Sequence, residues 1–224
     1  GNTYSIDLPV TAGAFQTAMP SPNNPSRAAA FVSKVNPGGT GLVYGTYLGN
    51  AGQTYPSAIA LDAAGNAYVT GWLTDSTTIP NFAGPVTSFG NINQNNGNLH
   101  AFVAKLNVAG SGLAYFTRLG GSYCSGQTCS AAQTRSNGIA VDSTGAAWVT
   151  GVTGATQIPM VKALQDTPSG LAADIFVAKL APAGNAIAYS TYLHGTATAA
   201  GPPNGNGTPV GNGIAVDAVG SVYV

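Results

Sequence analysis

Three aspartates recur in one short pattern and are the most regular candidates for chemistry in the chain. Asp62, Asp142 and Asp217 each begin a D-x-x-G sequence, and all seven acidic residues are Asp. A calcium ion takes about six to eight oxygen ligands, whereas each of these sequences offers one carboxylate. An Asp side chain can instead accept backbone N–H groups in a turn, where Gly supplies a positive φ. We therefore predict structural turns and no metal site. The glycines of the pattern are Gly65, Gly145 and Gly220.

Histidine occurs only at positions 100 and 194. His100 precedes the strand-like sequence AFVAKL and His194 follows YSTYL, so we assign both to strand ends. The chain has no nucleophile-elbow, phosphate-loop or zinc-protease motif. The remaining aspartates fall in separate connectors, whereas glycosidases use a close pair of carboxylates. We expect no catalytic residue, no cofactor and no enzyme activity.

The two cysteines, Cys124 and Cys129, lie in the sequence GGSYCSGQTCSAAQ. A metal site needs more donors than this pair, and a redox CxxC motif has a shorter spacing. We predict a disulfide that closes this Gly- and Ser-rich loop, with two free thiols as the alternative. A disulfide indicates an oxidising compartment, and hence a secreted or cell-surface protein.

Charge is scarce along the whole chain. Charged residues make up 6% of it, and seven basic residues balance seven acidic ones. No net positive field exists to attract a phosphate backbone, so we expect no nucleic-acid partner. No apolar run approaches the ~18 residues of a membrane span, so we expect no membrane insertion.

Two sequence blocks occur three times and predict the fold. The first reads FVSKVNPGGTGLVYGTYLG, FVAKLNVAGSGLAYFTRLG and FVAKLAPAGNAIAYSTYLH, starting at Phe31, Phe102 and Phe176. The second reads AIALDAAGNAYVTG, GIAVDSTGAAWVTG and GIAVDAVGSVYV, starting at positions 58, 138 and 213. β-Branched and aromatic residues alternate with small or polar ones, which is typical of strands. Each repeat of about 75 residues is expected to form one unit of four strands, two from each block.

Tandem four-stranded antiparallel units are typical of β-propellers, in which each unit is a blade. We predict an all-β chain with repeats at 31–100, 101–174 and 175–224, the last truncated in its final strand. Residues 1–30 would complete a preceding or neighbouring blade. A lysine recurs at one strand position, either lying along a blade boundary with its ammonium group in water or contributing to an anion-binding ring. These lysines are Lys34, Lys105 and Lys179.

Several motifs resemble those of one known family. They are FVAKL from Phe176, YSTYL over 189–193, GIAVD, NAYVTG over 66–71 and GAFQT over 13–17. In these motifs the chain closely resembles the bacterial SBBP-type β-propeller repeat. The resemblance implies a secreted or surface-exposed bacterial propeller. It implies no particular activity, because the family is defined by its repeat rather than by a site.

Three blades are fewer than the roughly four to eight of a closed propeller, and an isolated arc leaves strand edges open. The first residues, GNTYSIDLP, match GVTGATQIP at 151–159, and one added Thr would join the end of the chain to them in register. We expect an open or incomplete propeller. It is either part of a longer chain or a unit whose copies join into a ring or filament. The leading hypothesis is an extracellular structural or assembly protein whose partners are its own copies or further repeats.

The length variation among the repeats lies in connections that we expect on one face of the blades. Such a face is often the binding side of repeat proteins, although tolerated decoration is the alternative. Its neutral amide and aromatic side chains suit glycans or a neighbouring subunit. An extracellular carbohydrate- or ligand-binding propeller is therefore the alternative function, and the propeller domain of a secreted enzyme is a third. The candidate contact residues are Phe89, Asn91, Asn93, Gln94, Asn95, Asn96, Tyr123, Asn204 and Asn206.

Overall fold

The computed structural model describes the chain except for residues 25, 75–78, 85, 91, 93–98, 126–127, 171 and 196–208, and only the backbone of 125 and 128–131. The described part consists of strands and turns without a helix, which confirms the all-β prediction. The strands are β1 (Asn2–Thr3), β2 (Ala29–Val35), β3 (Leu42–Leu48), β4 (Thr54–Leu61), β5 (Ala67–Thr74), β6 (Val86–Phe89), β7 (Leu99–Leu106), β8 (Leu113–Leu119), β9 (Ser122–Ser125), β10 (Thr128–Ala131), β11 (Thr134–Val141), β12 (Ala147–Thr153), β13 (Asp174–Leu180), β14 (Ile187–Leu193), β15 (Ala215–Val216) and β16 (Val222–Tyr223).

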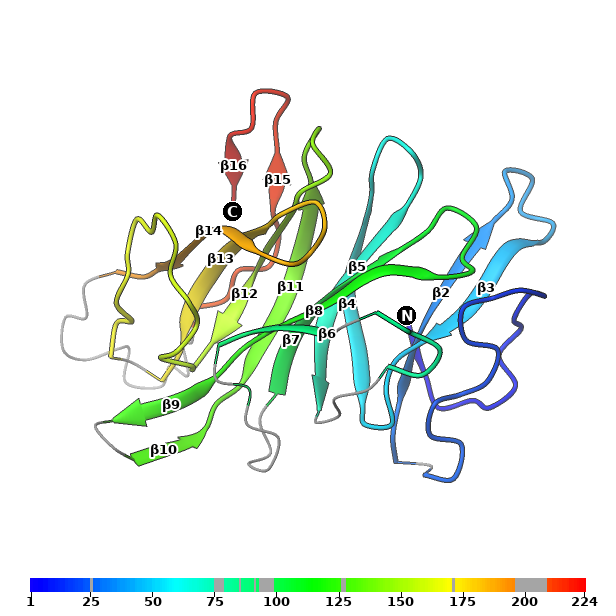
Figure 1. Ribbon diagram of the computed structural model, residues 1–224, viewed down its shortest axis with the longest axis horizontal. Coiled ribbons are helices and arrows are strands. Elements are labelled where there is room, and N and C mark those ends of the chain that lie inside the picture. Colours follow the sequence, from blue (N-terminus) through cyan, green and yellow to red (C-terminus); the bar gives the residue numbers. More distant parts are fainter. Residues whose placement is uncertain are drawn as a thin grey trace.

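Apart from the separate hairpin β9–β10, these strands form four successive sheets, which we number in chain order (Figure 1). The first sheet is β1–β2–β3, and the second has the order β4–β5–β7–β8–β6. The third sheet is β11–β12–β13–β14, and the fourth is the hairpin β15–β16. Neighbouring strands are antiparallel except β6, which runs parallel to β8.

The strand pairing corrects the expected grouping of strands. Each large sheet joins the second block of one repeat to the first block of the next, as the register of Gly71 with Phe102 and of Gly151 with Phe176 shows. The four strands within one repeat therefore do not form one sheet. Within a block a tight turn fixes the pairing, but both connections between blocks are long. The sequence alone does not tell which of them stays in a sheet and which crosses to the next.

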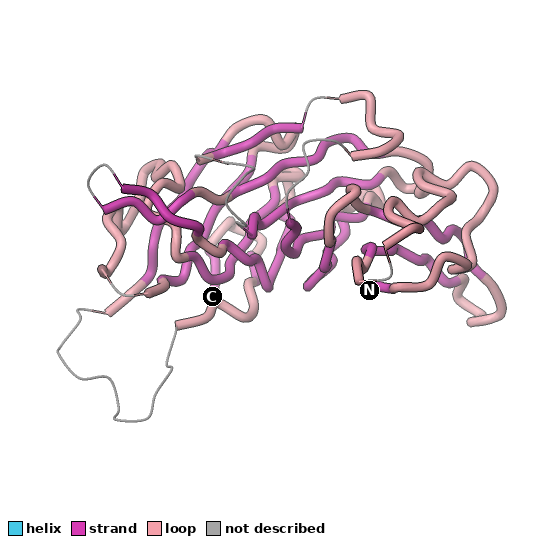
Figure 2. The backbone as a smooth tube through the Cα atoms, turned by 90° about the horizontal axis from the view of Figure 1, so that it is seen from below, coloured by secondary structure: helices cyan, strands magenta, loops and turns pink. Residues whose placement is uncertain are grey.

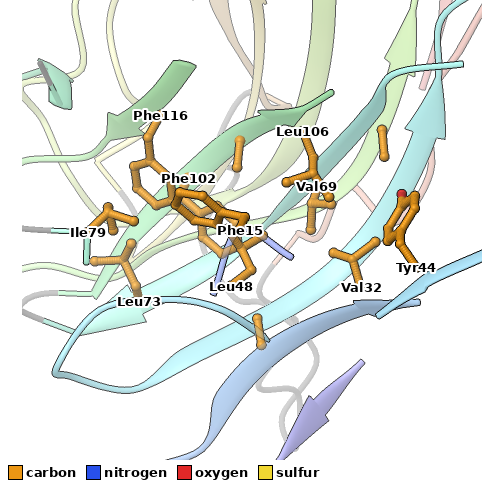
Figure 3. Close-up of a cluster of buried hydrophobic side chains, with 13 residues drawn as sticks. Phe15, Val32, Tyr44, Leu48, Val69, Leu73, Ile79, Phe102, Leu106 and Phe116 are labelled. Atoms are coloured by element: carbon orange, nitrogen blue, oxygen red, sulfur yellow. The ribbon is translucent and has the colours of Figure 1, made fainter. Parts of the chain in front are cut away.

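Two hydrophobic cores lie between successive sheets. Between the first and second sheets, the Phe102 and Phe116 rings stack with centroids 5.4 Å apart, beside Val32, Tyr44 and Leu48 (Figure 3). The core between the second and third sheets includes Tyr68, Val103, Tyr115, Leu119, Ile139, Val149, Phe176 and Leu180. Each sheet thus packs face to face with its neighbour, as blades do.

The sheets form an open row. The first strands of successive sheets lie together, because β11 packs against both β4 and β15. Figure 2 shows the elongated shape of this row from below. Among the described strands, none of the first sheet pairs with one of the fourth.

Two of the long connections contain strands that the sequence did not predict. The connection from β5 to β7 contains β6, which adds to the outer edge of the second sheet. The connection from β8 to β11 contains the hairpin β9–β10. Both elements are short and lack a repeated counterpart, so neither gave a periodic signal.

Candidate assembly interface

Each D-x-x-G sequence forms a hairpin turn that its own aspartate caps. Oδ1 of Asp62 accepts the backbone N–H groups of Ala64 (3.1 Å) and Asn66 (2.9 Å). Asp142 and Asp217 accept the equivalent N–H groups in their turns. The glycine of each turn has a positive φ, between 81° and 95°, which a side chain would strain. The aspartates therefore hold the hairpins β4–β5, β11–β12 and β15–β16.

In the second sheet, the other carboxylate oxygen of this aspartate binds a lysine from the following repeat. Nζ of Lys105, on β7, lies 3.3 Å from Oδ2 of Asp62. The Tyr68 hydroxyl lies 3.2 Å from the same oxygen, and Nζ of Lys105 lies 4.8 Å from the centre of the Tyr68 ring. We call this set of three the Asp–aromatic–Lys cluster. It connects the hairpin β4–β5 to β7.

The third sheet contains the same cluster. Nζ of Lys179 lies 2.8 Å from Oδ2 of Asp142 and 5.0 Å from the centre of the Trp148 ring. Nε1 of Trp148 donates to that oxygen at 3.3 Å. Sequence reasoning missed this pairing of the recurring lysines with the turn aspartates. The signal that could have found it is the strand register, in which each of these lysines stands opposite the aromatic residue of its cluster.

Both ions of the cluster in the second sheet are charged at neutral pH. Burial raises the pKa of Asp62, but hydrogen bonds from Asn66 and the contact with Lys105 outweigh it and bring the pKa to about 2. Burial lowers the pKa of Lys105, but Tyr68 and Asp62 raise it to a value above its usual one. Burial likewise raises the pKa of Asp142, and Lys179 and the turn hydrogen bonds hold it well below the usual range.

A third cluster is divided between the two ends of the row. Asp217 and Tyr223 occupy its first two positions, and the Tyr223 hydroxyl lies 3.3 Å from Oδ2 of Asp217. Lys34, at the lysine position of β2, has no ion-pair partner in the described part of the chain. Tyr223 is 61% exposed, whereas Tyr68 is fully buried. The fourth sheet thus has the aspartate and the aromatic residue of the repeated cluster, and the first sheet has its lysine.

One tyrosine of the first sheet and one of the second each pack on a glycine in a turn of the following sheet. A Cβ placed on Gly110 would lie 2.4 Å from the ring of Tyr44, and one on Gly184 would lie 2.3 Å from the ring of Tyr115. Both glycines have φ of +70°. Only glycine leaves room for the ring at this φ.

One glycine and one tyrosine of this series remain unmatched, at opposite ends of the row. Gly39, in the turn between β2 and β3, has φ of +68°, and a Cβ placed on it would have no atom within 4 Å. Tyr189, on β14, is half-buried, whereas its counterparts Tyr44 and Tyr115 are buried. The open space beside Gly39, which we call the socket, thus lies in the first sheet, and the unmatched ring of Tyr189 lies in the third.

Strand β2 exposes a face that its counterparts bury. Val35 is 56% exposed, whereas Leu106 and Leu180, at the same position in the other sheets, are fully buried. Phe31 on this face is half-buried, although Phe102 is completely buried. The difference arises because no sheet covers this side of the first sheet.

One groove lies between the first and second sheets, and another lies between the third and fourth. The groove beside β2 has a volume of about 310 Å³, and its lining includes Phe31, Ser33, Pro56, Ala58, Ile59 and Val69. The groove on the third sheet, next to β16, has a volume of about 280 Å³, and its lining includes Trp148, Val177, Tyr189, Leu193, Val222 and Val224. The described chain therefore has two apolar ends that carry complementary parts of the same repeated contacts.

The comparison with known families agrees with this arrangement. Residues 43–72, which run from β3 to β5, match the family described as SBBP, a beta-propeller repeat. The chain carries an SBBP repeat. The matched segment begins in the first sheet and ends in the second, so the repeat spans a junction between two sheets. No curated protein matches the chain.

The two cysteines lie outside the repeated contacts of the SBBP strands. Cys124 on β9 and Cys129 on β10 stand directly opposite each other in the hairpin register. The side chain of Cys129 is outside the described part, so the disulfide stays a prediction. In general, directly opposed residues of antiparallel strands have Cβ atoms about 4.5–5.5 Å apart, or closer in non-hydrogen-bonded pairs, and a disulfide spans about 3.5–4.5 Å.

Most candidate contact residues of the loop face lie outside the described residues. These are Asn91, Asn93, Gln94, Asn95, Asn96, Asn204 and Asn206. Tyr123, on β9, is exposed. Phe89 lies in β6 and packs against the core between the second and third sheets, so part of its ring is unavailable to a ligand.

Neither histidine of the chain lies in a cluster of potential ligands. His100, on β7, is completely buried; burial, and then the charge of Arg118, lower its pKa to about 4. The ring nitrogens of His194 lie 3.0 Å from the backbone oxygens of Gly195 and Thr167, which accept hydrogen bonds from ring N–H groups, and these contacts raise the pKa of His194. The described residues contain no group of three or more His, Cys, Asp or Glu side chains that could hold a metal ion. No helix long and apolar enough to cross a membrane occurs in the part of the chain that the structure describes.

Proposed function

We propose that this chain is an extracellular structural module whose SBBP repeats act through contacts with further units rather than through catalysis. One observation carries the proposal. The hairpin β15–β16 corresponds to β4–β5, and β2–β3 corresponds to β7–β8, so the two ends together hold the strands of one more blade. The units that would join these ends are copies of the chain or further repeats of a longer chain.

Physical chemistry favours covering these ends. Burying one Val or Leu side chain stabilises a complex by roughly 1.5–3 kcal/mol, and Val35, Val219 and Val224 are all exposed. Natural proteins protect open strand edges with charges or prolines, yet only 6% of this chain is charged. An exposed apolar edge with so little charge is suited to pairing with another strand.

Two observations support the extracellular part of the proposal. The cysteines of β9 and β10 stand opposite each other, and a disulfide between them would form in an oxidising compartment such as the cell exterior. The polar surface is built from amides, hydroxyls and glycine turns instead of charges. The loop-face alternative, binding of a carbohydrate, rests mostly on residues outside the described part. It stays a prediction that a glycan array would test.

Electron microscopy of the purified chain tests the proposed function. We expect rings or filaments in which several copies are joined, because each copy has two ends that another can cover. A field of isolated single arcs at all concentrations would contradict assembly from copies of this chain and leave further repeats of a longer chain as the unit that covers the ends. Rings and filaments differ plainly in such images, so the same experiment distinguishes closed from open assembly.

A further inference from the structure

We infer that His194 and Asp174 form a pH-dependent clamp that holds residues 166–170 against the third sheet. These residues belong to the connection between β12 and β13, and His194 directly follows β14. The clamp is closed when the His194 ring carries two protons, and it opens when the ring loses one of them. Both residues and the segment that they hold belong to one sheet and its own connection, so the clamp exists in every copy whatever units cover the ends.

The surroundings of the His194 ring require a proton on each ring nitrogen. Nδ1 lies 3.0 Å from the backbone oxygen of Gly195, and Nε2 lies 3.0 Å from that of Thr167. A backbone oxygen only accepts hydrogen bonds, and a neutral imidazole has a single N–H to donate. A neutral ring would therefore direct a lone pair at one of the two oxygens, whereas the imidazolium donates to both.

Asp174 supplies the opposite charge beside this ring. It is the first residue of β13 and is only 2% exposed. Ile175 stands opposite Leu193, so Asp174 and His194 occupy the next positions of these neighbouring strands. The backbone oxygens at the two nitrogens, and then the charge of Asp174, raise the pKa of His194 and outweigh the opposing effect of burial.

Among the described residues, no other charged group changes the pKa of this ring. Lys162 and Asp166 lie in the same connection and are exposed. Tyr192, on β14, donates its hydroxyl to the backbone oxygen of Ala155 at 3.0 Å. The proton on the ring is therefore governed by two backbone oxygens and one carboxylate.

The clamp holds the part of the connection that follows Gln165. The side chain of Gln165 exchanges two hydrogen bonds with the backbone of His194, at 2.9 and 3.0 Å, and these need no charge. Beyond it, the backbone oxygen of Thr167 binds the ring, and the N–H of Ser169 donates to Oδ2 of Asp174 at 3.0 Å. Loss of the ring proton removes the positive member of this pair and loosens the segment.

The first sheet shows that the glutamine contact forms without the ring. There Gln16 exchanges the same two hydrogen bonds with the backbone of Gly49, both at 3.0 Å. By strand register, Gly49 is the counterpart of His194, and Ala29 is the counterpart of Asp174. The imidazole and the carboxylate of the third sheet thus add a charged contact to a connection whose glutamine contact is already complete.

The raised pKa of His194 gives the direction of the pH dependence. The folded value lies above the ordinary one of about 6.5. The contribution of the clamp is therefore complete below about pH 6.5 and is lost as the pH rises through the folded pKa. The clamp opens in alkaline solution, whereas protonation of the buried His100 acts in acid.

Nitrogen-15 spectra of the histidine rings, recorded from mildly acidic to alkaline pH, test the charged ring. Both nitrogens of His194 should carry protons at neutral pH, with a titration midpoint above about 6.5. Asp174→Asn removes the negative charge and should lower this midpoint. His100 is the internal control, since its folded pKa of about 4 keeps it neutral over the same range. A His194 midpoint at or below about 6.5 would overturn the inference.

The variant His194→Gly separates the clamp from a merely structural role, because it places at this position the glycine of the first sheet. In the wild type, the exchange protection of the Ser169 amide, corrected for the intrinsic effect of pH, should fall at least tenfold across the His194 midpoint. In the variant it should be low at every pH, while circular dichroism remains that of the wild type. Protection of Ser169 that ignores the midpoint, or that is unchanged in His194→Gly, would contradict the clamp.

Discussion

Nζ of Lys105 lies 3.3 Å from Oδ2 of Asp62, although the two residues belong to successive sequence repeats. The pair connects the hairpin β4–β5 with β7, the next strand of the same sheet. Lys179 and Asp142 make the same connection in the third sheet at 2.8 Å. These ion pairs show that the physical unit is a sheet shared by two repeats.

Substitution of Lys105 should therefore destabilise the fold. Lys105→Met removes the ion pair and leaves Asp62 without one of its partners, and we expect a loss of roughly 1.5–3 kcal/mol in the free energy of unfolding, the range for hydrogen bonds to charged groups. Lys34→Met, at the same strand position without a partner, should lose almost nothing in the monomer. Urea unfolding at low protein concentration measures both. Equal losses would contradict the role of the cluster.

The tyrosine sockets predict a second contrast between matched positions. Gly184→Ala forces a Cβ into the Tyr115 ring at a positive φ, and should cost roughly 2–4 kcal/mol through crowding and backbone strain. Gly39→Ala has nearly the same φ but open space around the Cβ. It should cost only about 1 kcal/mol of strain. Thermal unfolding of the two variants as monomers measures the difference, and a Gly39→Ala cost as large as that of Gly184→Ala would refute the socket.

Acid should weaken the fold through His100. Because its folded pKa is about 4, the unfolded chain takes up a proton near the ordinary value of about 6.5 while the folded chain does not. Stability is therefore full above pH 6.5 and falls as the pH drops toward 4, by up to about 3 kcal/mol. The raised pKa of His194 means that its protonation stabilises the fold as the pH falls. Protonation of Asp62 lowers the free energy of unfolding only below about pH 4.

The variant His100→Gln isolates this effect. Urea midpoints of the wild type should fall between pH 7 and pH 5, whereas those of the variant should change much less. Both proteins should contain Lys34→Asp, so that association does not change the midpoint. Parallel curves for the two would show that another group causes the acid sensitivity.

Hydrogen exchange offers a backbone test of strand addition at β2. In the assembled protein the N–H groups of Ser33 and Val35 should be protected, because a strand of the unit that covers β2 accepts them. In the Lys34→Asp variant the same two amides should exchange at least tenfold faster. The N–H of Phe31, which β1 already binds, provides the internal control. Unchanged protection at Ser33 and Val35 would exclude strand addition at this edge.

Much of this molecule could be predicted from its sequence because the strands and turns are repeated. The D-x-x-G turns and the alternation around Phe102 and Phe176 placed the strands and the hairpins of each block. Which two sequence blocks share a sheet could not be predicted, because both connections between blocks are long. Strands β6 and β9–β10 were missed because they occur once, so no second copy reinforced their pattern.

The interface itself was only partly visible in the sequence. Comparison of the chain ends predicted an open blade, but not which side chains would meet across it. Lys34 resembles Lys105 and Lys179 in sequence, and only the three-dimensional register reveals that a turn aspartate faces each of the latter two. The packing of Tyr44 on Gly110 and of Tyr115 on Gly184 is a contact between sheets, which strand periodicity does not encode.

The mass of the assembled chain tests the central claim most directly. Light scattering on the purified wild-type protein should give a multiple of the 22.2 kDa of one chain. A mass of 22.2 kDa for the wild type over the whole accessible concentration range would contradict the account.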